Sequence, residues 1–459
     1  MTETVVIVGG GQAGAQAAVS LRQEGFDGRV VLIGDEPMLP YQRPPLSKTY
    51  LAGELAMERL LIKPPAFYDK VNIERLLGET VSAIDSRQQI ISLNSGQTLP
   101  YDHLILATGG RVRRLDCSGA NHPRVHYLRT LADVNAMHDK FTEGARLVVI
   151  GGGYVGLETA AVAVKLGLKV TLLVARPTAL GRVTSPEVGK FFEAVHREAG
   201  VALCCNTEVK AIEDEEGNGQ VAAIVTDNGY RVLADMVVVG IGLLPNVELA
   251  ESAGVACDDG IVVDEYGRTS VDNLYAAGDC ANHPNPIYQR RMRLESVQNA
   301  IEQGKTVAAT ICGKDKPYAQ VPWFWSDQYD LKLQTAGINS GYDQTIVRGD
   351  PASRSFAVFY LREGRLLAVD AINRPAEFVV SRNIIAKGIA VSAECLQDEH
   401  IPAKSLADKA ADLSSDTLPD QIQTHTRTES TTPASTLTST QTYKQTVSPG
   451  RALPREWIA

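Results

Sequence analysis

The chain has 459 residues, which suggests two to four domains at roughly 100–200 residues each, and its hydrophobic content of 44% is ordinary for a soluble globular protein. A net charge of −9 argues against a general nucleic-acid binder. No apolar run of about 18 residues predicts a membrane-spanning helix, and the N-terminus lacks the basic segment of a secretory signal, so we expect a cytoplasmic protein.

The seven cysteines are scattered along the chain, and none forms a CxxC pair or a cluster with histidine. Reduced thiols in an intracellular protein explain this pattern better than disulfides or a metal site do. We therefore expect no bound metal and no role for a disulfide.

Two segments of the chain share one pattern. Thr4–Glu36 and Arg146–Pro177 each contain an apolar β-branched run, a glycine-rich turn, an alanine-rich helical stretch and a second apolar run. This order predicts a βαβ unit that occurs twice. A glycine follows each expected helix, Gly25 in the first unit and Gly167 in the second, as is usual at a helix C-terminus.

Each unit carries the G-x-G-x-x-G spacing directly after its first strand. The glycines are Gly9, Gly11 and Gly14 in the first unit and Gly151, Gly153 and Gly156 in the second. In such turns the first glycine makes the tight turn, the second lets the backbone approach a pyrophosphate, and the third lets the helix pack closely on the strand. Because strand and helix patterns flank both copies, we predict two dinucleotide sites, each at a helix N-terminus.

An acidic residue after the second strand of such a unit accepts hydrogen bonds from ribose hydroxyls. In the first unit Asp35 occupies this place, and Glu36 is the neighbouring candidate. In the second unit we take Val174 as the equivalent position, followed by Ala175 and Arg176, so the acid is missing. Two interpretations stay open: Arg176 favours the 2′-phosphate of NADPH, or it points to solvent and selectivity for the adenosine is lax.

The remaining elements follow in chain order. Arg231–Gly242 predicts a buried strand that ends at a glycine turn, and Gly267–Cys280 predicts a turn, a strand and a tight turn. We expect an antiparallel hairpin across Glu363–Gly364 and a helix near Pro375–Lys387. Residues 406–459 are rich in Ser and Thr and have no periodic apolar face, so we predict a disordered tail.

Two dinucleotide sites in one chain suggest electron transfer between a resident flavin and a diffusible nicotinamide. Seven motifs, taken together and in order, resemble the oxygenase-coupled NADH-dependent ferredoxin reductases of the glutathione-reductase structural class. They are VVIVGGGQAG, PYQRPPLSKTYL, YDHLILATGG, VVIGGGYVGLE, GIGLLPN, LYAAGDCA and WFWSDQY. The resemblance extends from about Thr4 to Leu406.

The resemblance implies an α/β fold with two Rossmann-like dinucleotide-binding domains, for FAD and NAD, and a small α+β C-terminal domain. The FAD domain is expected over residues 1–110 and 243–325, the NAD(P)H domain over 111–242 and the C-terminal domain over 326–405. By the same resemblance the protein takes hydride from NAD(P)H, with NADH favoured. It then passes single electrons to a [2Fe-2S] ferredoxin that serves a cytochrome P450 or a ring-hydroxylating dioxygenase.

The resemblance also implies the site residues. Those expected at FAD, besides the glycines of the first turn, are Ala13, Asp35, Arg43, Lys48, Val81, Ala107, Thr108, Gly109, Arg129, Asp279, Val297 and Trp325. Those expected at the nicotinamide nucleotide, besides the glycines of the second turn, are Tyr154, Glu158, Arg176 and Gly242. Hydride transfer needs stacking, orientation and exclusion of water, so we expect no acid, base or nucleophile.

Several of these positions have a second interpretation. Tyr154 is expected to stack over the flavin until nicotinamide displaces it, or to pack as a surface aromatic of its helix. Glu158 either acts near the nicotinamide or forms a cap or salt bridge. Trp325 either covers the flavin edge and contacts the partner or is a core residue, and Val81 by itself is typical of a core valine.

Two further features lie near the glycine-aspartate turn at Gly278. Arg290, Arg291 and Arg293 form either a basic patch that steers an acidic ferredoxin or a solvated run of charge. His283 is expected at the protein surface.

The segment Leu39–Leu51, LPYQRPPLSKTYL, excludes several relatives on this fold. Disulfide reductases, and the peroxidases and oxidases that use one cysteine, carry their cysteines after the first βαβ unit, whereas the first cysteine here is Cys117. The prolines fix the path of this loop, and Lys48, with Arg43 as a second candidate, offers a cation to the flavin. The Ser/Thr tail lacks the amphipathic helix by which some quinone reductases bind membranes.

Two alternatives keep the same cofactor sites. One is a redox-responsive binding protein resembling apoptosis-inducing factor, and the other is an FAD-dependent NADH dehydrogenase with an acceptor other than ferredoxin. Fast NADH-driven reduction of ferredoxin would favour the reductase, whereas a long-lived charge-transfer complex with poor turnover would favour the binding protein.

Overall fold

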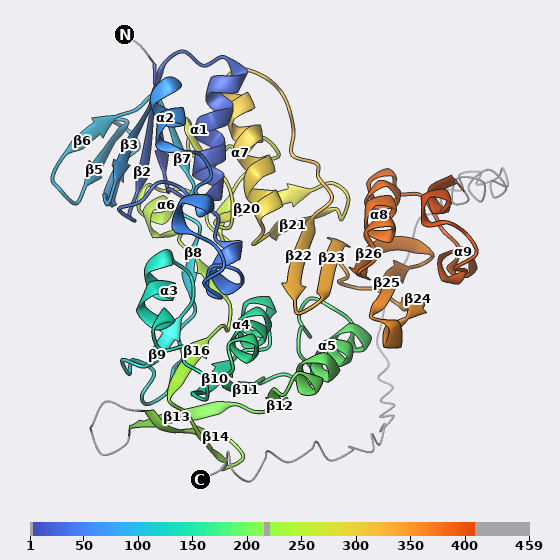
Figure 1. The fold of residues 1–459 in the computed structure, drawn as a ribbon. Coiled ribbons are helices and arrows are strands. Elements are labelled where there is room, and N and C mark those ends of the chain that lie inside the picture. Colours follow the sequence, from blue (N-terminus) through green and yellow to red (C-terminus); the bar gives the residue numbers. More distant parts are fainter. Residues whose placement is uncertain (1–2, 215–220, 409–459) are drawn as a thin grey trace, which may run out of the picture.

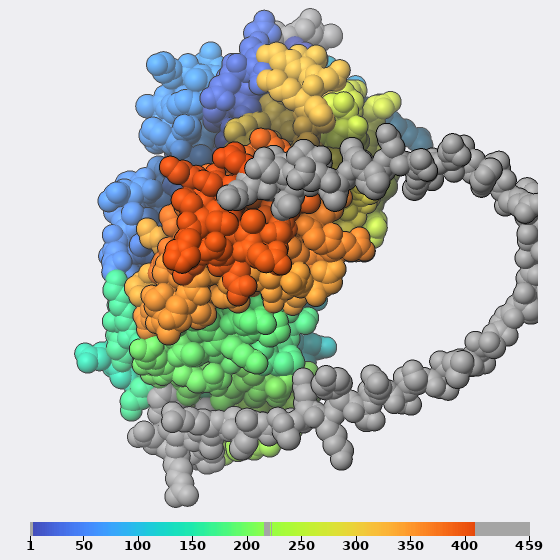
Figure 2. All heavy atoms as spheres, turned by 90° about the vertical axis from the view of Figure 1, so that its right-hand side faces the viewer, coloured from blue at the N-terminus to red at the C-terminus, as the bar shows by residue number. Residues whose placement is uncertain are grey.

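The computed structural model describes residues 3–214 and 221–408. The chain forms three parts (Figure 1), and in the side view the C-terminal part, orange to red, lies in front of the other two at mid-height (Figure 2). Leu406, at the start of the expected tail, is fully buried in the core of the C-terminal part. The rest of that prediction, from residue 409 to 459, lies outside the described residues.

The first part is built on a five-stranded parallel sheet in the order β19-β7-β1-β2-β3. Its strands are β1 (Thr4–Val8), β2 (Arg29–Gly34), β3 (Ile73–Leu77), β7 (His103–Leu106) and β19 (Leu274–Ala276). Because β19 comes from much later in the chain than its neighbours, two distant segments build this sheet. The strands are almost wholly apolar, as is typical of a parallel sheet covered on both faces.

The two faces of this sheet have different covers. Helices α1 (Gln12–Glu24) and α7 (Val297–Ile311) lie side by side on one face, where Val5 and Ile7 of β1 join their core (Figure 1). Val6 and Val8 point to the opposite face, toward an antiparallel sheet. That sheet consists of β4 (Val81–Asp85), β5 (Ile90–Leu93) and β6 (Thr98–Pro100), and the short helices of this part are α2 (Pro65–Lys70) and α6 (Glu248–Ser252).

The second part repeats this plan. Its parallel sheet has the order β12-β11-β10-β16-β9, made of β9 (Val125–Tyr127), β10 (Arg146–Ile150), β11 (Lys169–Leu173), β12 (Ala202–Cys204) and β16 (Met236–Val239). One face packs on α4 (Tyr154–Lys165) and α5 (Pro186–Glu198), and α3 (Leu131–His138) lies nearby. The other face packs on an antiparallel sheet of β13 (Val209–Asp214), β14 (Val221–Thr226) and β15 (Arg231–Leu233). The predicted pair of βαβ units is therefore confirmed.

One expected strand is in fact two. Residues 231–242 were predicted to form a single buried strand, but β15 belongs to the antiparallel sheet and β16 to the parallel one. The chain changes sheet at Asp235, whose carboxylate accepts hydrogen bonds from the backbone and guanidinium of Arg146. The single-strand prediction was wrong because both halves are apolar and buried, so that only the one carboxylate between them marks the break.

Two short antiparallel strands carry the chain into and out of the second part. These are β8 (Gly110–Val112) and β17 (Leu243–Pro245). Beside them, the Thr108 hydroxyl donates to the carbonyl of Asn246 at 2.7 Å, and the Asn246 amide donates to the carbonyl of Thr108 at 2.9 Å. A small sheet of β18 (Ile261–Val262), β20 (Ala281–Asn285) and β21 (Arg290–Arg293) follows α6 in the chain.

The C-terminal part is an antiparallel sheet in the order β22-β23-β26-β25-β24. Its elements are β22 (Trp323–Gln328), β23 (Leu331–Gly337), β24 (Gln344–Asp350), β25 (Ser355–Arg362), β26 (Arg365–Ile372), α8 (Pro375–Lys387) and α9 (Ala393–Gln397). The expected hairpin turn at Glu363–Gly364, with φ of 50° and 73°, and the expected helix are both present. Since β22 begins at Trp323, we draw the boundary of this part before that residue.

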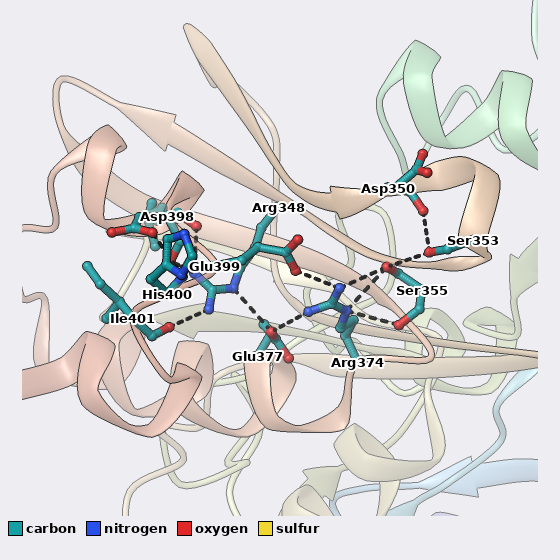
Figure 3. Close-up of polar contacts among 11 residues, drawn as sticks. Arg348, Asp350, Ser353, Ser355, Arg374, Glu377, Asp398, Glu399, His400 and Ile401 are labelled. Carbon is teal, nitrogen blue, oxygen red and sulfur yellow. Dashed lines mark hydrogen bonds and ion pairs between the residues drawn. The ribbon is translucent and has the colours of Figure 1, made fainter.

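A buried arginine fastens α9 and the residues after it to the C-terminal sheet. Arg348 of β24 is 2% exposed and forms an ion pair with Glu377 of α8 at 3.2 Å (Figure 3). Its guanidinium also donates to the backbone carbonyls of Leu396, Asp398 and Ile401. Arg374 shares Glu377 and reaches Glu399 and the carbonyl of Ser355. One side chain therefore fixes three backbone carbonyls of this segment, beside the apolar contacts that Leu396 and Leu406 make with the same core.

We predict that Arg348→Met lowers the free energy of unfolding by about 3 kcal/mol, because it leaves three carbonyls without their donor and the buried Glu377 with only the Arg374 ion pair. Urea unfolding measures this change. Arg29→Met is the matched control, since Arg29 pairs with Glu74 at an exposed site where the loss should stay below about 1 kcal/mol. Equal losses in the two variants would contradict the role given to Arg348.

Candidate functional site

The first glycine-rich turn leaves an open space in front of α1. A Cβ on Gly9 would lie 2.1 Å from the carbonyl oxygen of Ala107, and one on Gly14 would lie 2.0 Å from that of Gly9. A Cβ on Gly11 would meet nothing within 4 Å. Gly11 is the N-cap of α1 and no side chain caps this helix, so its free N–H groups and its dipole favour an anion there.

The second turn has the same geometry. A Cβ on Gly151 would lie 2.3 Å from the carbonyl oxygen of Gly240, and one on Gly156 would lie 2.0 Å from that of Gly151. A Cβ on Gly153 would meet nothing within 4 Å, and α4 again begins without a side-chain cap. In both turns the outer glycines serve close packing and the middle glycine faces open space, as a bound pyrophosphate requires.

Strand register changes one equivalence between the two units. Ile33 of β2 and Leu173 of β11 hold the same register position against β1 and β10, each opposite the residue before the first glycine. Two residues further on, Asp35 therefore corresponds to Ala175. The choice of Val174 was wrong by one position, because that residue is buried at 4% exposure before the chain leaves the sheet. An acid is still missing from the second unit.

The charged residues that follow the second strand of each unit differ in whether they have a partner. Asp35 is exposed, and within the described residues its carboxylate has no partner. Glu36 is occupied, because it accepts a hydrogen bond from Tyr41 at 2.5 Å and pairs with Arg43 at 2.6 Å. Arg176, which corresponds to Glu36, is exposed and pairs with no residue in the described ranges. The first unit thus offers a free carboxylate and the second a free guanidinium.

Lys48 and Glu158 form an ion pair that joins the three parts of the chain. The Lys48 Nζ lies 2.8 Å from the Glu158 Oε2, and the two side chains are 16% and 3% exposed. The Ser47 hydroxyl donates to the same oxygen at 2.6 Å, and the Ser326 hydroxyl of β22 donates to Oε1 at 2.6 Å. Burial raises the pKa of Glu158, while Lys48 and the two hydroxyls act in the opposite direction.

A second chain of polar contacts runs from Arg43 to the glycine-aspartate turn. The Arg43 guanidinium donates to the carbonyl of Arg129 at 2.7 Å, and the Arg129 guanidinium lies 3.2 Å from the Asp279 carboxylate. Burial raises the pKa of Asp279, and Arg129 acts against this. The turn itself is held by Gln303 of α7, whose side-chain oxygen accepts from the N–H of Gly278 at 2.7 Å.

The other positions expected at FAD lie around the ends of the first sheet. Thr108, between Ala107 and Gly109 beyond β7, is engaged with Asn246. Ala13 packs beneath the turn, where a Cβ on Gly278 would lie 2.9 Å from its own Cβ. Val297 begins α7, whose first turn is capped by Ser296, and Val81 is 4% exposed in the core behind the sheet. On the nicotinamide side, a Cβ on Gly242 would meet only the Arg182 guanidinium, at 3.5 Å.

Aromatic rings form a continuous run from α4 to the C-terminal part. The Tyr154 ring stacks on Phe324 with centroids 4.4 Å apart and an interplanar angle of 29°. Phe324 is 6.1 Å from Trp325, which is 5.6 Å from Trp323. The Arg382 guanidinium of α8 lies over the Trp323 ring at 5.6 Å. Trp325 is half-buried.

The three arginines of β21 do not share one environment. Arg290 is exposed, and its side chain has no partner among the described residues. Arg291 donates to the backbone carbonyls of Val263 and Asn282. Arg293 is 11% exposed and pairs with two neighbours, Asp259 and Glu295. The free charge on this strand is therefore mainly that of Arg290.

His283 was expected at the surface, and this was wrong. The ring is 1% exposed in β20, between α7 and the segment that contains Tyr318. Its Nδ1 lies 2.9 Å from the Gln303 Nε2, so it supports the side chain that holds the glycine-aspartate turn. Burial lowers its pKa to about 4. The polar sequence around His283 gave no sign that this strand runs beneath a helix.

All seven cysteines are free thiols. Within the described ranges, 3–214 and 221–408, no group of three or more side chains is arranged to hold a metal ion. None of the helices in these ranges has both the length and the apolar character needed to cross a bilayer.

Several known proteins are similar to this chain. Residues 3–304 match the family model of the pyridine nucleotide-disulphide oxidoreductases, and residues 323–407 match that of a reductase C-terminal domain. Putidaredoxin reductase from Pseudomonas putida is 46% identical over 407 residues, 88% of this chain and 96% of that protein. A ferredoxin–NAD(P)+ reductase from a Sphingomonas species is 45% identical over 390 residues, 84% and 94% of the two chains.

Among solved structures, the covalent putidaredoxin reductase–putidaredoxin complex matches with a TM-score of 0.87 at 44% identity, over 89% of this chain and 99% of that one. Two nucleotide-binding turns and a C-terminal sheet packed between their units define an oxidoreductase with two dinucleotides. The chain belongs to the pyridine nucleotide-disulphide oxidoreductase family, and like its ferredoxin reductase relatives it uses FAD and NAD(P)H. The resemblance inferred from the sequence is confirmed.

The residues present fit both nucleotides. Two uncapped helix N-termini face open space at Gly11 and Gly153, which suits two pyrophosphates. The free carboxylate of Asp35 suits a ribose, and the same place in the second unit offers Arg176 instead. We propose that FAD binds at the first turn, where Asp35 can bind the adenosine ribose, and the nicotinamide nucleotide at the second.

Sequence reasoning missed several side chains that organise this site. Ser47 and Ser326 complete the coordination of Glu158, Asn246 fastens the two connecting strands, and Phe324 carries the stack on Tyr154. Ser47 precedes Lys48 in a loop already singled out, but it is 111 residues from Glu158 in the sequence. No spacing in the chain signals such a contact.

We predict that Gly11→Ala and Gly153→Ala separate the two cofactors. Each added methyl enters open space at ordinary φ, so both variants should fold, but the backbone can no longer approach its pyrophosphate closely. Gly11→Ala should be purified with less of the yellow FAD than the parent protein. Gly153→Ala should keep its FAD and raise the KM for NADH by roughly tenfold, or ~1.4 kcal/mol.

The measurements are flavin absorbance per chain and steady-state kinetics with ferricyanide as the acceptor. Each variant is the control for the other, since they change the same position in two equivalent turns. The reverse pattern, with FAD lost from Gly153→Ala alone, would overturn the assignment.

Proposed function

We propose that this protein takes hydride from NADH onto FAD and passes single electrons to a [2Fe-2S] ferredoxin that serves a cytochrome P450 or a ring-hydroxylating dioxygenase. The observation that carries the proposal is the aromatic run from Tyr154, at the second nucleotide turn, to the half-buried Trp325. The similarity to a ferredoxin–NAD(P)+ reductase and to putidaredoxin reductase supports it.

The residues on the nicotinamide side bind and orient rather than donate protons. Bound FAD supplies the chemistry, because it accepts a pair of electrons as hydride and can release them one at a time. Lys48 is held by Glu158 as a fixed cation in a nearly water-free position. Tyr154 covers the site through its stack on Phe324, and so excludes water until the nicotinamide arrives.

The residues on the exit side suit an acidic partner. Trp325 offers an indole at the end of the aromatic run, and Arg382, stacked on Trp323, has no acidic partner among the described residues. Arg290 adds a second unpaired cation. In a protein of net charge −9, such local positive charge favours the approach of an acidic ferredoxin in one orientation.

The loop Leu39–Leu51 supports electron exit without a thiol. Its prolines begin a short 3-10 helix, Pro44–Ser47, that delivers Ser47 and Lys48 to Glu158. No cysteine is present in this loop to relay electrons. The seven free thiols further support a reducing compartment, and we place the protein in the cytoplasm on that ground.

We predict that Trp325→Ala slows ferredoxin reduction by roughly tenfold while ferricyanide reduction stays within about twofold, because only the protein partner needs the indole surface. Steady-state assays with both acceptors measure the ratio. Tyr230→Ala is the control, since Tyr230 is an exposed aromatic, at 47% exposure, on the nicotinamide unit. Equal losses with both acceptors in Trp325→Ala would remove the residue from the partner surface.

We predict a preference for NADH over NADPH that a substitution at either of two adjacent positions can widen. Ala175→Asp places a carboxylate where the first unit has Asp35, so it should repel a 2′-phosphate and lower kcat/KM for NADPH by about tenfold. Arg176→Ala should also lower kcat/KM for NADPH and leave that for NADH within about twofold. An unchanged ratio of the kcat/KM values for NADH and NADPH in both variants would show that these residues do not meet the adenosine.

A further inference from the structure

A buried carboxyl group in the C-terminal part has no cationic partner. Asp370 of β26 is fully buried, and no lysine or arginine of the described residues contacts it. Its Oδ1 accepts a hydrogen bond from the Thr335 hydroxyl at 2.6 Å, and its Oδ2 accepts one from the Tyr360 hydroxyl at 2.5 Å. Burying a carboxyl group without a cation is costly, so its retention at the centre of this sheet calls for a reason.

Both hydrogen bonds lead out of the sheet into the nicotinamide unit. Thr335 of β23 stands opposite Asp370 on β26 and opposite Phe324 on β22, so it lies beside Tyr154 at the start of α4, whose ring stacks on Phe324. Tyr360 accepts a hydrogen bond at 2.9 Å from the backbone N–H of Ser185, the N-cap of α5. Asp370 thus reaches the second nucleotide turn through one neighbour and the start of α5 through the other.

The proton count fixes the direction of the first connection. Thr335 has a single hydroxyl proton, which it donates to the Asp370 carboxylate, so its oxygen is left to accept from the Tyr154 hydroxyl. The three groups form a chain from Tyr154 through Thr335 to a negative charge. Such a chain is stronger than its separate bonds, because each bond polarises the next.

Asp370 is also poised to change its charge. Burial raises its pKa to about 6, and the hydrogen bonds from Thr335 and Tyr360 act in the opposite direction. The titratable groups that face it are Tyr360 on β25 and Tyr154 on α4, and burial raises the pKa of both hydroxyls, so both stay neutral. The charge of Glu158, on the same helix as Tyr154, also raises the pKa of the Tyr154 hydroxyl.

We propose that Asp370 is a positioning residue that, through Thr335, holds the Tyr154 ring over Phe324 and so sets how readily the ring yields to the nicotinamide. This rests on the proposed function, in which Tyr154 covers the nicotinamide site. The anionic form of Asp370 holds the ring more firmly than the neutral form, whose own proton must point to Thr335 or Tyr360 and reverses a bond of the chain. Nucleotide binding then carries the energetic cost of releasing the ring.

The test measures the apparent Kd for NADH from stopped-flow reduction of the bound flavin between pH 5.5 and 8. In the parent protein the Kd should fall about threefold to tenfold as the pH decreases through the pKa of Asp370, the factor that one hydrogen bond is worth. In Asp370→Asn the Kd should be low and independent of pH. Thr335→Val and Tyr154→Phe should behave in the same way, because each removes one member of the chain.

Two further variants separate this role from general support of the sheet. Adding Asp370→Asn to Tyr154→Phe should change the Kd no further, since the hydroxyl through which Asp370 acts is already gone. Tyr360→Phe should keep the pH dependence and move its midpoint upward, because the carboxylate loses one donor. An unchanged pH profile in Asp370→Asn, or additive effects in the double variant, would overturn the proposal.

A readout without cofactor is the free energy of unfolding of the apoprotein as a function of pH. The folded-state pKa of Asp370 is raised, so its contribution is fully present near pH 4 and is lost as the pH rises through about 6. Asp370→Asn should remove that slope, and an identical slope in parent and variant would contradict the proposal.

If Asp370→Asn fails to fold, the pH dependence of the Kd in Thr335→Val and Tyr154→Phe decides the question. A protein whose flavin is reduced by NADH but which cannot reduce ferredoxin would refute the proposed function and leave this inference standing.

Discussion

The ion pair between Lys48 and Glu158 is the contact on which the rest of the site depends. Glu158 is almost wholly buried, and a carboxylate there is tolerable only because a lysine and two hydroxyl groups surround it. Lys48 and Ser47 come from a loop of the first unit and Ser326 from strand β22, while Glu158 itself lies on helix α4. Loss of any one partner would leave a buried charge poorly satisfied, so the pair fixes the relative positions of three parts that also share one apolar cluster.

The two nucleotide units show how one backbone solution serves two ligands. Their glycines meet the same neighbours at nearly the same distances, so the phosphate-binding geometry is common to both. The units differ in the residues just past the second strand, where one has a free carboxylate and the other a free guanidinium. The C-terminal sheet then supplies what neither unit has: the rings that stack beside α4 and the hydroxyls that reach into it.

Much of this fold could be predicted from the sequence, because glycine spacing and apolar periodicity are local. The helix over Pro375–Lys387, the hairpin turn at Glu363–Gly364 and the repeated βαβ unit all follow from patterns within a few residues. The misses come from long-range packing. The sheet change at Asp235 and the burial of His283 depend on which other elements pack against those strands. The Val174 error arose because the residue at which a strand leaves its sheet is set by the neighbouring strands. The serines around Glu158 had no signal at all.

The chain enters and leaves the nicotinamide unit through the neighbouring strands β8 and β17, fastened by Asn246. Because the two connections to this inserted unit lie side by side, the whole unit can be exchanged between relatives by joining the chain at two neighbouring points. A chimera must rebuild contacts on both sides of the unit: those of Glu158, Arg43–Arg129 and Arg129–Asp279 toward the first part, and Tyr360–Ser185, His196–Gln328 and Thr335–Tyr154 toward the C-terminal part. Evolution of nucleotide preference in this scaffold therefore need not disturb the flavin core.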